Sequence, residues 1–197
     1  MDDTRRGWFR WLGGWLLVLG MPASMPAAAS ETDHAARLQQ GGHVLLLRHA
    51  EAPGFGDPPR FRLDDCSTQR NLDARGRAQA AAIGAWLRRH GVRDARVHSS
   101  LWCRCLETAR LLDLGPVTPL PALNSLFGRA QERERSLAEL NAFFAAQPAD
   151  GPLLILVTHF ANIQALTGSG PGSGEGVLLQ LQAGAAPRVV GRLDFRH

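Results

Sequence analysis

The stretch VLLLRHAEA, residues 44–52, decides the fold that we expect. Its run of consecutive apolar residues is typical of a strand that is buried on both faces of a parallel sheet. The run ends abruptly in Arg48, His49 and Glu51. In sheets of this kind ligands bind beyond the strand ends, so we expect the chemistry of the protein at this point.

Strand-like and helix-like segments alternate along the rest of the chain. A second apolar run, PLLILVTHF at residues 152–160, also ends in a polar pair, Thr158 and His159. Such alternation in 197 residues predicts one α/β domain, a three-layer α/β/α sandwich with a mostly parallel central sheet. Further strands are expected at 95–100, 176–182 and 188–195, helices at 31–42, 72–91, 101–112, 132–147 and 161–168, and loops at 51–71 and 116–128.

Three polar clusters follow predicted strands. The carboxyl ends of parallel strands meet at one edge of a sheet, so these clusters should gather there from distant parts of the chain. They are Arg48 with His49, Ser99 and Ser100 with Arg104, and Thr158 with His159.

Two histidines and two arginines at one sheet edge suit phosphoryl transfer. A neutral imidazole can attack phosphorus and carry the phosphoryl group, which splits one difficult displacement into two easier steps. Guanidinium groups stabilise the charge on the phosphoryl oxygens. Arg104 also falls in the first turn of a predicted helix, whose amide groups favour an anion.

Composition and motifs exclude several other kinds of site. All 22 Lys and Arg residues are Arg, so a P-loop lysine and a Schiff-base lysine are both excluded. No serine lies in a G-x-S-x-G elbow, and no cysteine lies six residues before an arginine. The basic residues are scattered along the chain, so nucleic-acid binding is not expected despite a pI near 10.1.

Four motifs follow one another along the chain: LLLRHAE, NLDARGRAQA, VHSSLWCRCLETA and LILVTHFANIQAL. Together they resemble the histidine phosphatase superfamily, the group that contains cofactor-dependent phosphoglycerate mutase and many small phosphatases. The first and last motifs depart from the family pattern, since Ala50 and Phe160 stand where the family has glycine. The resemblance extends from Leu45 to Leu166, which is nearly the whole predicted domain.

This resemblance implies a phosphoglycerate mutase-like fold and a set of catalytic residues. His49 would be the nucleophile that becomes phosphohistidine, and Arg48, Arg104 and His159 would complete the phosphate pocket. Neither a metal nor any other cofactor is implied. The substrate phosphate is expected to contact Arg48, Arg104, Ser99, Thr158 and Arg70.

The family pattern also raises the question of the general acid. Many members have a glutamate after a leucine in the loop beyond the second arginine, but PALNSLFG offers Ser125 at this place. A general acid typically contributes about 10²–10⁴-fold. Either the leaving group is already good, as in a phosphoramidate or an anhydride, or another carboxylate protonates it. The candidates are Glu51, Asp64, Asp65 and Glu175.

The N-terminus has the pattern of a secretory signal peptide. Basic residues precede an apolar stretch, WLGGWLLVLGM, and small residues then suit cleavage after Ala29 or Ser30. The apolar stretch is shorter than the roughly 20 residues that span a bilayer. We therefore expect a signal peptide at residues 1–29 and an exported phosphatase domain at residues 30–197, without stable membrane insertion.

Export places the cysteines in an oxidising compartment, where disulfides form. Cys103 and Cys105 are too close together for an easy bridge, so Cys66 is expected to pair with one of them. The sequence does not decide which. A metal site is not expected here, because CRC lacks a second pair at ligand spacing.

These observations predict a periplasmic, metal-independent phosphomonoesterase. The layout is similar to the exported branch that acts on phosphorylated heptose of lipopolysaccharide, which suggests an anionic sugar phosphate or a similar small substrate as the partner. A catalytically silent phosphate- or glycan-binding protein of the same fold is the alternative. A third possibility is a phosphatase or mutase for cytoplasmic metabolites with an uncleaved N-terminal anchor. The oligomeric state is left open.

Overall fold

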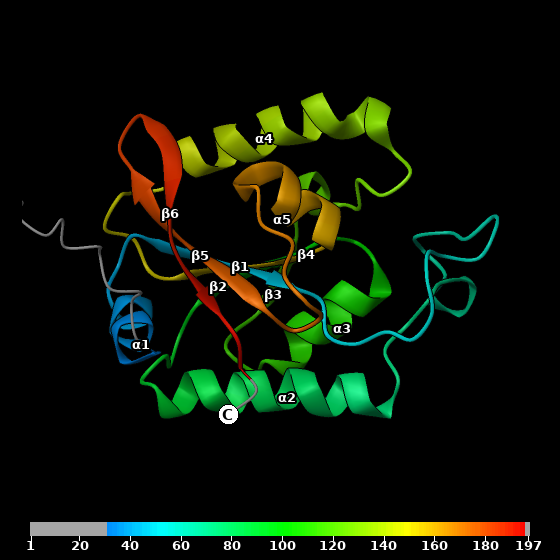
Figure 1. Cartoon of the computed structure of the whole chain (residues 1–197), viewed down its shortest axis with the longest axis horizontal. Helices are drawn as coiled ribbons and strands as arrows, with labels where there is room; N and C mark the ends of the chain where they lie inside the picture. Colours follow the sequence, from blue (N-terminus) through cyan, green and yellow to red (C-terminus); the bar gives the residue numbers. More distant parts are fainter. Residues whose placement is uncertain (1–30, 196–197) are drawn as a thin grey trace, which may run out of the picture.

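The computed structural model describes residues 31–195, so the expected signal peptide, residues 1–29, lies outside the described range. Within it six strands form one sheet in the order β3-β2-β4-β1-β5-β6 (Figure 1). β1 to β4 are parallel, whereas β5 is antiparallel to both β1 and β6. The strands are β1 His43–Arg48, β2 Arg96–Ser99, β3 Val117–Pro119, β4 Leu154–Thr158, β5 Gly176–Gln182 and β6 Ala185–Leu193.

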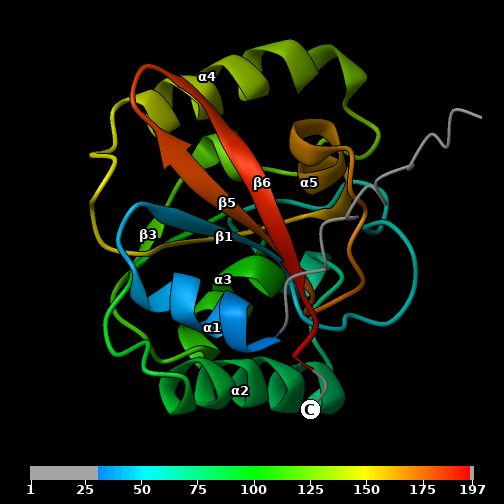
Figure 2. The same ribbon diagram turned by 60° about the vertical axis from the view of Figure 1, so that its left-hand side comes forward.

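Helices cover both faces of this sheet and complete the three layers that the sequence predicts. α1, α2 and α3 lie against one face, and α4 and α5 lie against the other (Figures 1 and 2). Among residues 31–195 no helix is long and apolar enough to cross a membrane. The α-helices are α1 Glu31–Gln39, α2 Ala74–Arg89, α3 Cys103–Leu111, α4 Arg133–Ala145 and α5 Phe160–Thr167. Short 3-10 helices span Cys66–Thr68, Pro121–Leu123 and Ala130–Glu132.

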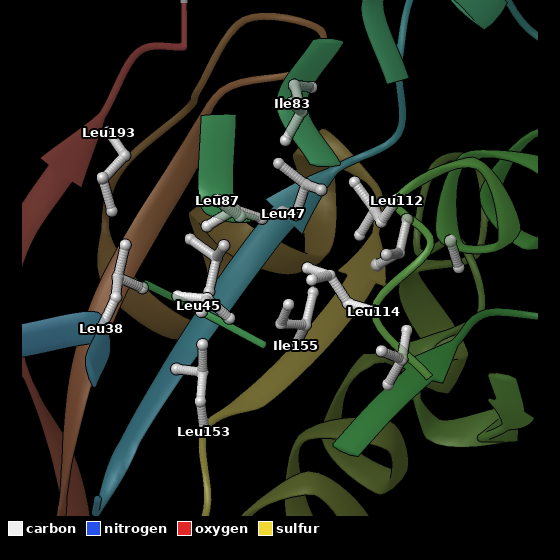
Figure 3. Packing of buried hydrophobic residues seen from close by; sticks show 14 of the residues in the cluster. Leu38, Leu45, Leu47, Ile83, Leu87, Leu112, Leu114, Leu153, Ile155 and Leu193 are labelled. Atoms are coloured by element: carbon white, nitrogen blue, oxygen red, sulfur yellow. The ribbon is translucent and has the colours of Figure 1, made fainter. Parts of the chain in front are cut away.

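The central strand β1 is buried on both faces because its side chains alternate between two hydrophobic clusters. Leu45 and Leu47 pack with Ile83 of α2 on one face (Figure 3). Val44 and Leu46 pack on the other face with side chains of α4 and α5. Full burial of each such side chain contributes about 1.5–3 kcal/mol. This explains why the strand reads as a continuous apolar run, and the α/β fold prediction is confirmed.

One strand was not expected. β3, Val117–Pro119, lies in the segment that the sequence predicts as a loop. It has three residues and pairs only with β2, with Val97 opposite Val117. Proline is tolerated at a sheet edge because one side of an edge strand needs no ladder hydrogen bond. A strand so short, and ending in proline, leaves no periodic signal in the sequence.

The approach of α2 to the end of α3 requires a glycine. A Cβ atom on Gly84 would lie 2.1 Å from the carbonyl oxygen of Leu112, which follows the last residue of α3. The obstacle is backbone and cannot rotate away. Gly84 therefore sets how closely α3 packs, and the first turn of α3 carries Arg104.

We expect Gly84→Ala to lower the free energy of unfolding by about 2 kcal/mol, because the backbone has to move apart. Alanine is the better helix former by about 1 kcal/mol, so propensity alone predicts the opposite sign. Urea denaturation of the parent and the variant measures the difference. Ala81→Gly, at an exposed position of α2, calibrates the propensity effect. A Gly84→Ala protein that equals or exceeds the parent in stability would contradict the close approach.

Candidate active site

The pairing of β1 with β4 places two histidines at one edge of the sheet. Arg48 is the register partner of Thr158, and the next residue of each strand is a histidine. The His49 amide donates a hydrogen bond to the Thr158 carbonyl at 3.0 Å. The imidazoles of His49 and His159 lie edge to face, with ring centres 5.4 Å apart. Two of the three polar clusters predicted from the sequence therefore meet here.

The His49 imidazole is buried and held in one tautomer. Its Nδ1 lies 2.8 Å from the carbonyl oxygen of Ala50. A carbonyl only accepts hydrogen bonds, so Nδ1 carries the proton and Nε2 keeps a lone pair. Burial, and then the positive charge of Arg104, lower the pKa of His49 to about 3. The ring is therefore a neutral nucleophile near pH 7.

The His159 imidazole is equally enclosed. Its Nε2 lies 2.9 Å from the Ser100 hydroxyl and 3.4 Å from the Cys105 thiol. Burial, followed by the proximity of His49, lowers the pKa of His159 well below its usual value. Burial also raises the pKa of Cys105 to about 12, so this thiol stays protonated and is no nucleophile. Ser100 rather than Ser99 thus supports the second histidine.

Arg104 joins the two histidines from the first turn of α3. Its Nε donates to Nε2 of His49 at 3.3 Å, and its Nη2 lies 3.5 Å from Nδ1 of His159. The side chain is almost fully buried, with 4% of its surface exposed. The Nε/Nη2 edge of this guanidinium therefore faces both imidazoles, where a phosphoryl group bound to His49 would lie. This placement brings in the third predicted cluster.

Arg48 approaches the site from the end of β1. Its Nη1 donates to the Pro171 carbonyl at 3.0 Å, and its buried Nε has no hydrogen-bond partner within the described residues. Burial lowers the pKa of Arg48, although Glu175 acts in the opposite direction. An arginine nevertheless remains charged in proteins. An unpaired buried donor is costly, so an anion bound beside it would gain a hydrogen bond.

Asp57 is a site residue that the sequence did not reveal. Its carboxylate accepts from Nη1 of Arg104 at 2.8 Å and from Nη2 at 3.2 Å, and from Nε1 of Trp102 at 2.9 Å. The backbone amide of Arg70 adds a fourth hydrogen bond at 3.0 Å. Burial would raise the pKa of Asp57, but these hydrogen bonds outweigh it and lower the pKa. Asp57 is therefore ionised and fixes the orientation of Arg104.

The loop that carries Asp57 (residues 51–72) is fastened to three consecutive residues at the start of α3. Asp57 binds Trp102 and Arg104, as described above. The disulfide joins Cys66 to Cys103, which settles the pairing that the sequence left open. The Cys103 amide also donates to the side chain of Gln69 at 3.0 Å. The long cyan loop of Figure 1 is thus a structural part of the site.

Two residues of the sequence motifs hold the chain around the histidines. The Gln79 side chain accepts from the Glu51 amide at 2.8 Å and donates to the Ser173 carbonyl at 2.8 Å. The Thr108 hydroxyl accepts from the Ala50 amide at 3.0 Å and donates to the Arg104 carbonyl at 2.7 Å. These contacts fix the segments that follow β1 and precede β5.

Of three further residues expected to contact the substrate, two lie outside the pocket lining and one lies within it. The Ser99 hydroxyl donates to the Ser100 carbonyl at 2.8 Å, and the Thr158 hydroxyl donates to the Leu123 carbonyl at 2.7 Å. Both side chains are buried and lie outside the pocket lining, so their predicted substrate contacts are replaced by structural hydrogen bonds. Arg70 does line the pocket, but its guanidinium donates to the carbonyls of Ala52 and Gly56 within its own loop.

Some of the candidate general acids line the pocket and others do not. Ser125 and Glu51 line the pocket, whereas Asp64, Asp65 and Glu175 do not. The Glu51 carboxylate is 44% exposed and lies 3.8 Å from a guanidinium nitrogen of Arg75. Of the carboxylates named from the sequence, Glu51 alone reaches the pocket.

The pocket itself is large. Its volume is about 920 Å³, which is near the upper end of the range for small-molecule sites. Among residues 31–195 no three His, Cys, Asp or Glu side chains are grouped in a way that could hold a metal ion. The pocket lining includes these residues with ionisable side chains or a hydroxyl group near the histidines: Arg48, His49, Glu51, Asp57, Arg70, Arg104, Ser125, Arg129 and His159.

Comparisons with known proteins bear on the family and the fold of the chain. The sequence model of the histidine phosphatase superfamily (branch 1) matches residues 44–151. A search of curated protein sequences finds no significant match. Similar solved structures include the protein histidine phosphatase SixA complexed with tungstate, with 16% identity over 78% of this chain and 97% of that chain, and a TM-score of 0.57. Mycobacterial glucosyl-3-phosphoglycerate phosphatase has 18% identity over 79% of this chain and 99% of that chain, and a TM-score of 0.56.

Another similar structure is assigned as the phosphohistidine phosphatase SixA of Agrobacterium tumefaciens. It has 24% identity over 78% of this chain and 98% of that chain, and a TM-score of 0.51. At these identities the solved structures support the fold.

We expect Asp57→Asn to lower the free energy of unfolding by about 3 kcal/mol, because it leaves the buried Arg104 without its counterion. Chemical denaturation at pH 7 measures the loss. Asp64→Asn is the matched control: Asp64 is 87% exposed and lies 3.7 Å from Arg62, so its removal should cost no more than about 0.5 kcal/mol. Equal stability of both variants would show that the Asp57–Arg104 pair does not hold the site.

We also expect His49 to remain neutral, with its proton on Nδ1, from pH 8 down to about pH 4. Imidazole nitrogen NMR shifts report this directly, and His49→Ala assigns the signal. Because the folded-state pKa lies below that of the unfolded chain, the unfolded chain binds the proton first as the pH falls. The free energy of unfolding should therefore decrease between pH 6.5 and about 3. A titration midpoint between pH 6 and 7 would contradict this environment.

Proposed function

Because the chain belongs to branch 1 of the histidine phosphatase superfamily, we propose that it hydrolyses phosphomonoesters through a phosphohistidine on His49. The observation that carries the proposal is the neutral His49 ring, whose Nε2 lone pair lies 3.3 Å from the Arg104 guanidinium. A nucleophile and an oxyanion stabiliser are thus in contact at the base of one pocket. This is the pairing that covalent phosphoryl transfer requires.

In the first step the Arg104 Nε–H exchanges its hydrogen bond to Nε2 for one to a phosphoryl oxygen, and the freed Nε2 lone pair of His49 attacks phosphorus. The N–P bond forms as the bond to the leaving oxygen breaks, and the leaving oxygen keeps the electron pair. The Ala50 carbonyl accepts a hydrogen bond from Nδ1–H and stabilises the positive charge that develops on the ring. No proton has to leave His49 before the attack, because the ring is already neutral.

The charge on the phosphoryl oxygens is stabilised by fixed cations. Arg104 presents Nε and Nη2 beside both histidines, and Asp57 holds it in this orientation. Arg48 adds a buried Nε donor without a partner. Because these groups are preorganised and largely out of water, they need little reorganisation during the reaction.

In the second step water attacks the phosphohistidine. The new P–O bond forms while the N–P bond breaks, and its electron pair returns to Nε2. Inorganic phosphate leaves and the water protons go to phosphate and solvent. No step uses a metal ion or another cofactor, in keeping with the family resemblance.

The leaving group receives its proton from Glu51 or from water. Glu51 lines the pocket and its carboxylate lies 3.8 Å from Arg75, whereas Asp57 is ionised and bound to Arg104. Because 44% of the Glu51 side chain is exposed, solvent water competes with it as the proton donor. The enzyme should therefore favour substrates whose leaving group needs little protonation.

We further propose that the protein works after export, in the periplasm. The N-terminal pattern supports this, and so does the Cys66–Cys103 disulfide, because such bonds persist in oxidising compartments. The sugar phosphate suggested by the exported branch is one substrate class to be assayed. The phosphohistidine named for the SixA structures is a second, because its nitrogen leaving group also needs little acid catalysis.

We expect the purified protein to hydrolyse an aryl phosphate between pH 4 and 8 in the presence of a chelator, and His49→Ala to lose at least about 10³-fold in kcat. Phosphate release is the measurement, and acid-quenched protein should carry labelled phosphate on a histidine. His90→Ala, at the end of α2, is the control. Bound phosphate without turnover would establish the silent binding protein instead.

A further inference from the structure

Exposed aromatic side chains gather at the mouth of the pocket. Among residues 31–195 four large hydrophobic side chains are exposed: Phe55 at 87%, Phe127 at 55%, Val189 at 42% and Phe160 at 40%. The three phenylalanines line the pocket that contains His49, and Val189 does not. Large apolar side chains exposed together, rather than singly, mark a binding site.

These rings form an ordered surface. The rings of Phe55 and Phe127 meet edge to face with centres 5.0 Å apart. The Phe127 ring also lies beside Gly56, where an added Cβ would be 3.9 Å from it. An edge-to-face contact of this kind contributes about 0.5–1.5 kcal/mol, which favours this arrangement of the two rings.

Phe160 connects this surface to the phosphate site. Its ring lies under the Arg48 guanidinium, which is 5.5 Å from the ring centre. On another side the ring lies so close to Gly170 that a Cβ there would be 2.4 Å away. Phe160 thus lines the same pocket as Phe55 and Phe127, one residue beyond His159 and next to a cation of the phosphate site.

The proton donors in the pocket also limit which substrates it can hydrolyse. In the part of the chain that the structure describes, two carboxylates line the pocket: Asp57, which is bound to Arg104, and the half-exposed Glu51. A phenol has a pKa of about 10, so phenolate is a good leaving group. An aliphatic alcohol has a pKa near that of water, about 16, so an alkoxide is a poor leaving group unless an acid protonates it. An aryl group therefore departs without a strong general acid.

We propose that Phe55, Phe127 and Phe160 form a subsite for an aromatic leaving group, so that the enzyme acts on aryl phosphomonoesters in preference to sugar phosphates. This inference rests on the proposed function and names its substrate class. The phosphoryl group binds between His49 and Arg104. The attached ring lies against the phenylalanines, and binding buries apolar surface of both the substrate ring and the phenylalanines.

The test compares phenyl phosphate with 2-naphthyl phosphate, whose leaving groups are similarly acidic but differ in aromatic area. We expect the wild type to show a kcat/KM about tenfold higher for the naphthyl ester, which corresponds to about 1.4 kcal/mol. The Phe55→Ala/Phe127→Ala double variant should lose this preference through a higher KM. It should keep kcat and inhibition by inorganic phosphate, since neither residue touches the phosphate site.

Val189→Ala is the matched control, because it removes an exposed apolar side chain outside the pocket and should leave the preference unchanged. Equal kcat/KM for the two esters in the wild type, a preference that survives the double variant, or faster hydrolysis of a sugar phosphate would each overturn the aromatic subsite. Turnover of every substrate without preference would leave the phosphatase proposal intact. If nothing is hydrolysed, binding of 2-naphthyl and methyl phosphonate by calorimetry decides the subsite independently, since only the former should bind more weakly to the double variant.

Discussion

The backbone pairing of β1 with β4 is the constraint on which the site depends. The two strands end at the same level, with Arg48 opposite Thr158, so His49 and His159 leave the sheet together. The register is secure because both strands bury alternate side chains on each face of the sheet. A slip by one residue would turn the side chains of one strand to opposite faces and separate the histidines.

Burial at this strand end determines the electrostatics. Imidazoles removed from water and placed beside guanidinium groups remain neutral, which makes His49 a nucleophile without a separate base. The same low dielectric makes a buried arginine without a counterion costly, and Asp57 provides the counterion for Arg104. Arg48, whose buried Nε has no partner in the described residues, gains most from a bound anion. The phosphate pocket is thus ordered before any substrate arrives.

The loop 51–72 links the stability of the protein to its chemistry. Its carboxylate Asp57, its disulfide to Cys103 and the side chain of Gln69 all converge on the start of α3. Ordering a long loop is costly in entropy, and these fixed points restrict the loop in the folded protein. The same loop contributes Phe55 to the mouth of the pocket. One irregular segment therefore orients the phosphate-binding arginine and shapes the opening through which the substrate enters.

The sequence alone predicted the layered fold and named Arg48, His49, Arg104 and His159, because apolar periodicity and polar strand ends are local features and because the four motifs resemble one family. It also placed most helices and strands, but missed β3, whose three residues carry no periodic pattern. Only the tertiary structure decided the roles that depend on long-range contacts. It brought Asp57 to Arg104, set Ser100 rather than Ser99 against His159, chose Cys103 as the partner of Cys66, and gathered three phenylalanines at one opening. A loop takes its conformation from whatever it packs against, so the sequence within the loop does not reveal which atoms will meet.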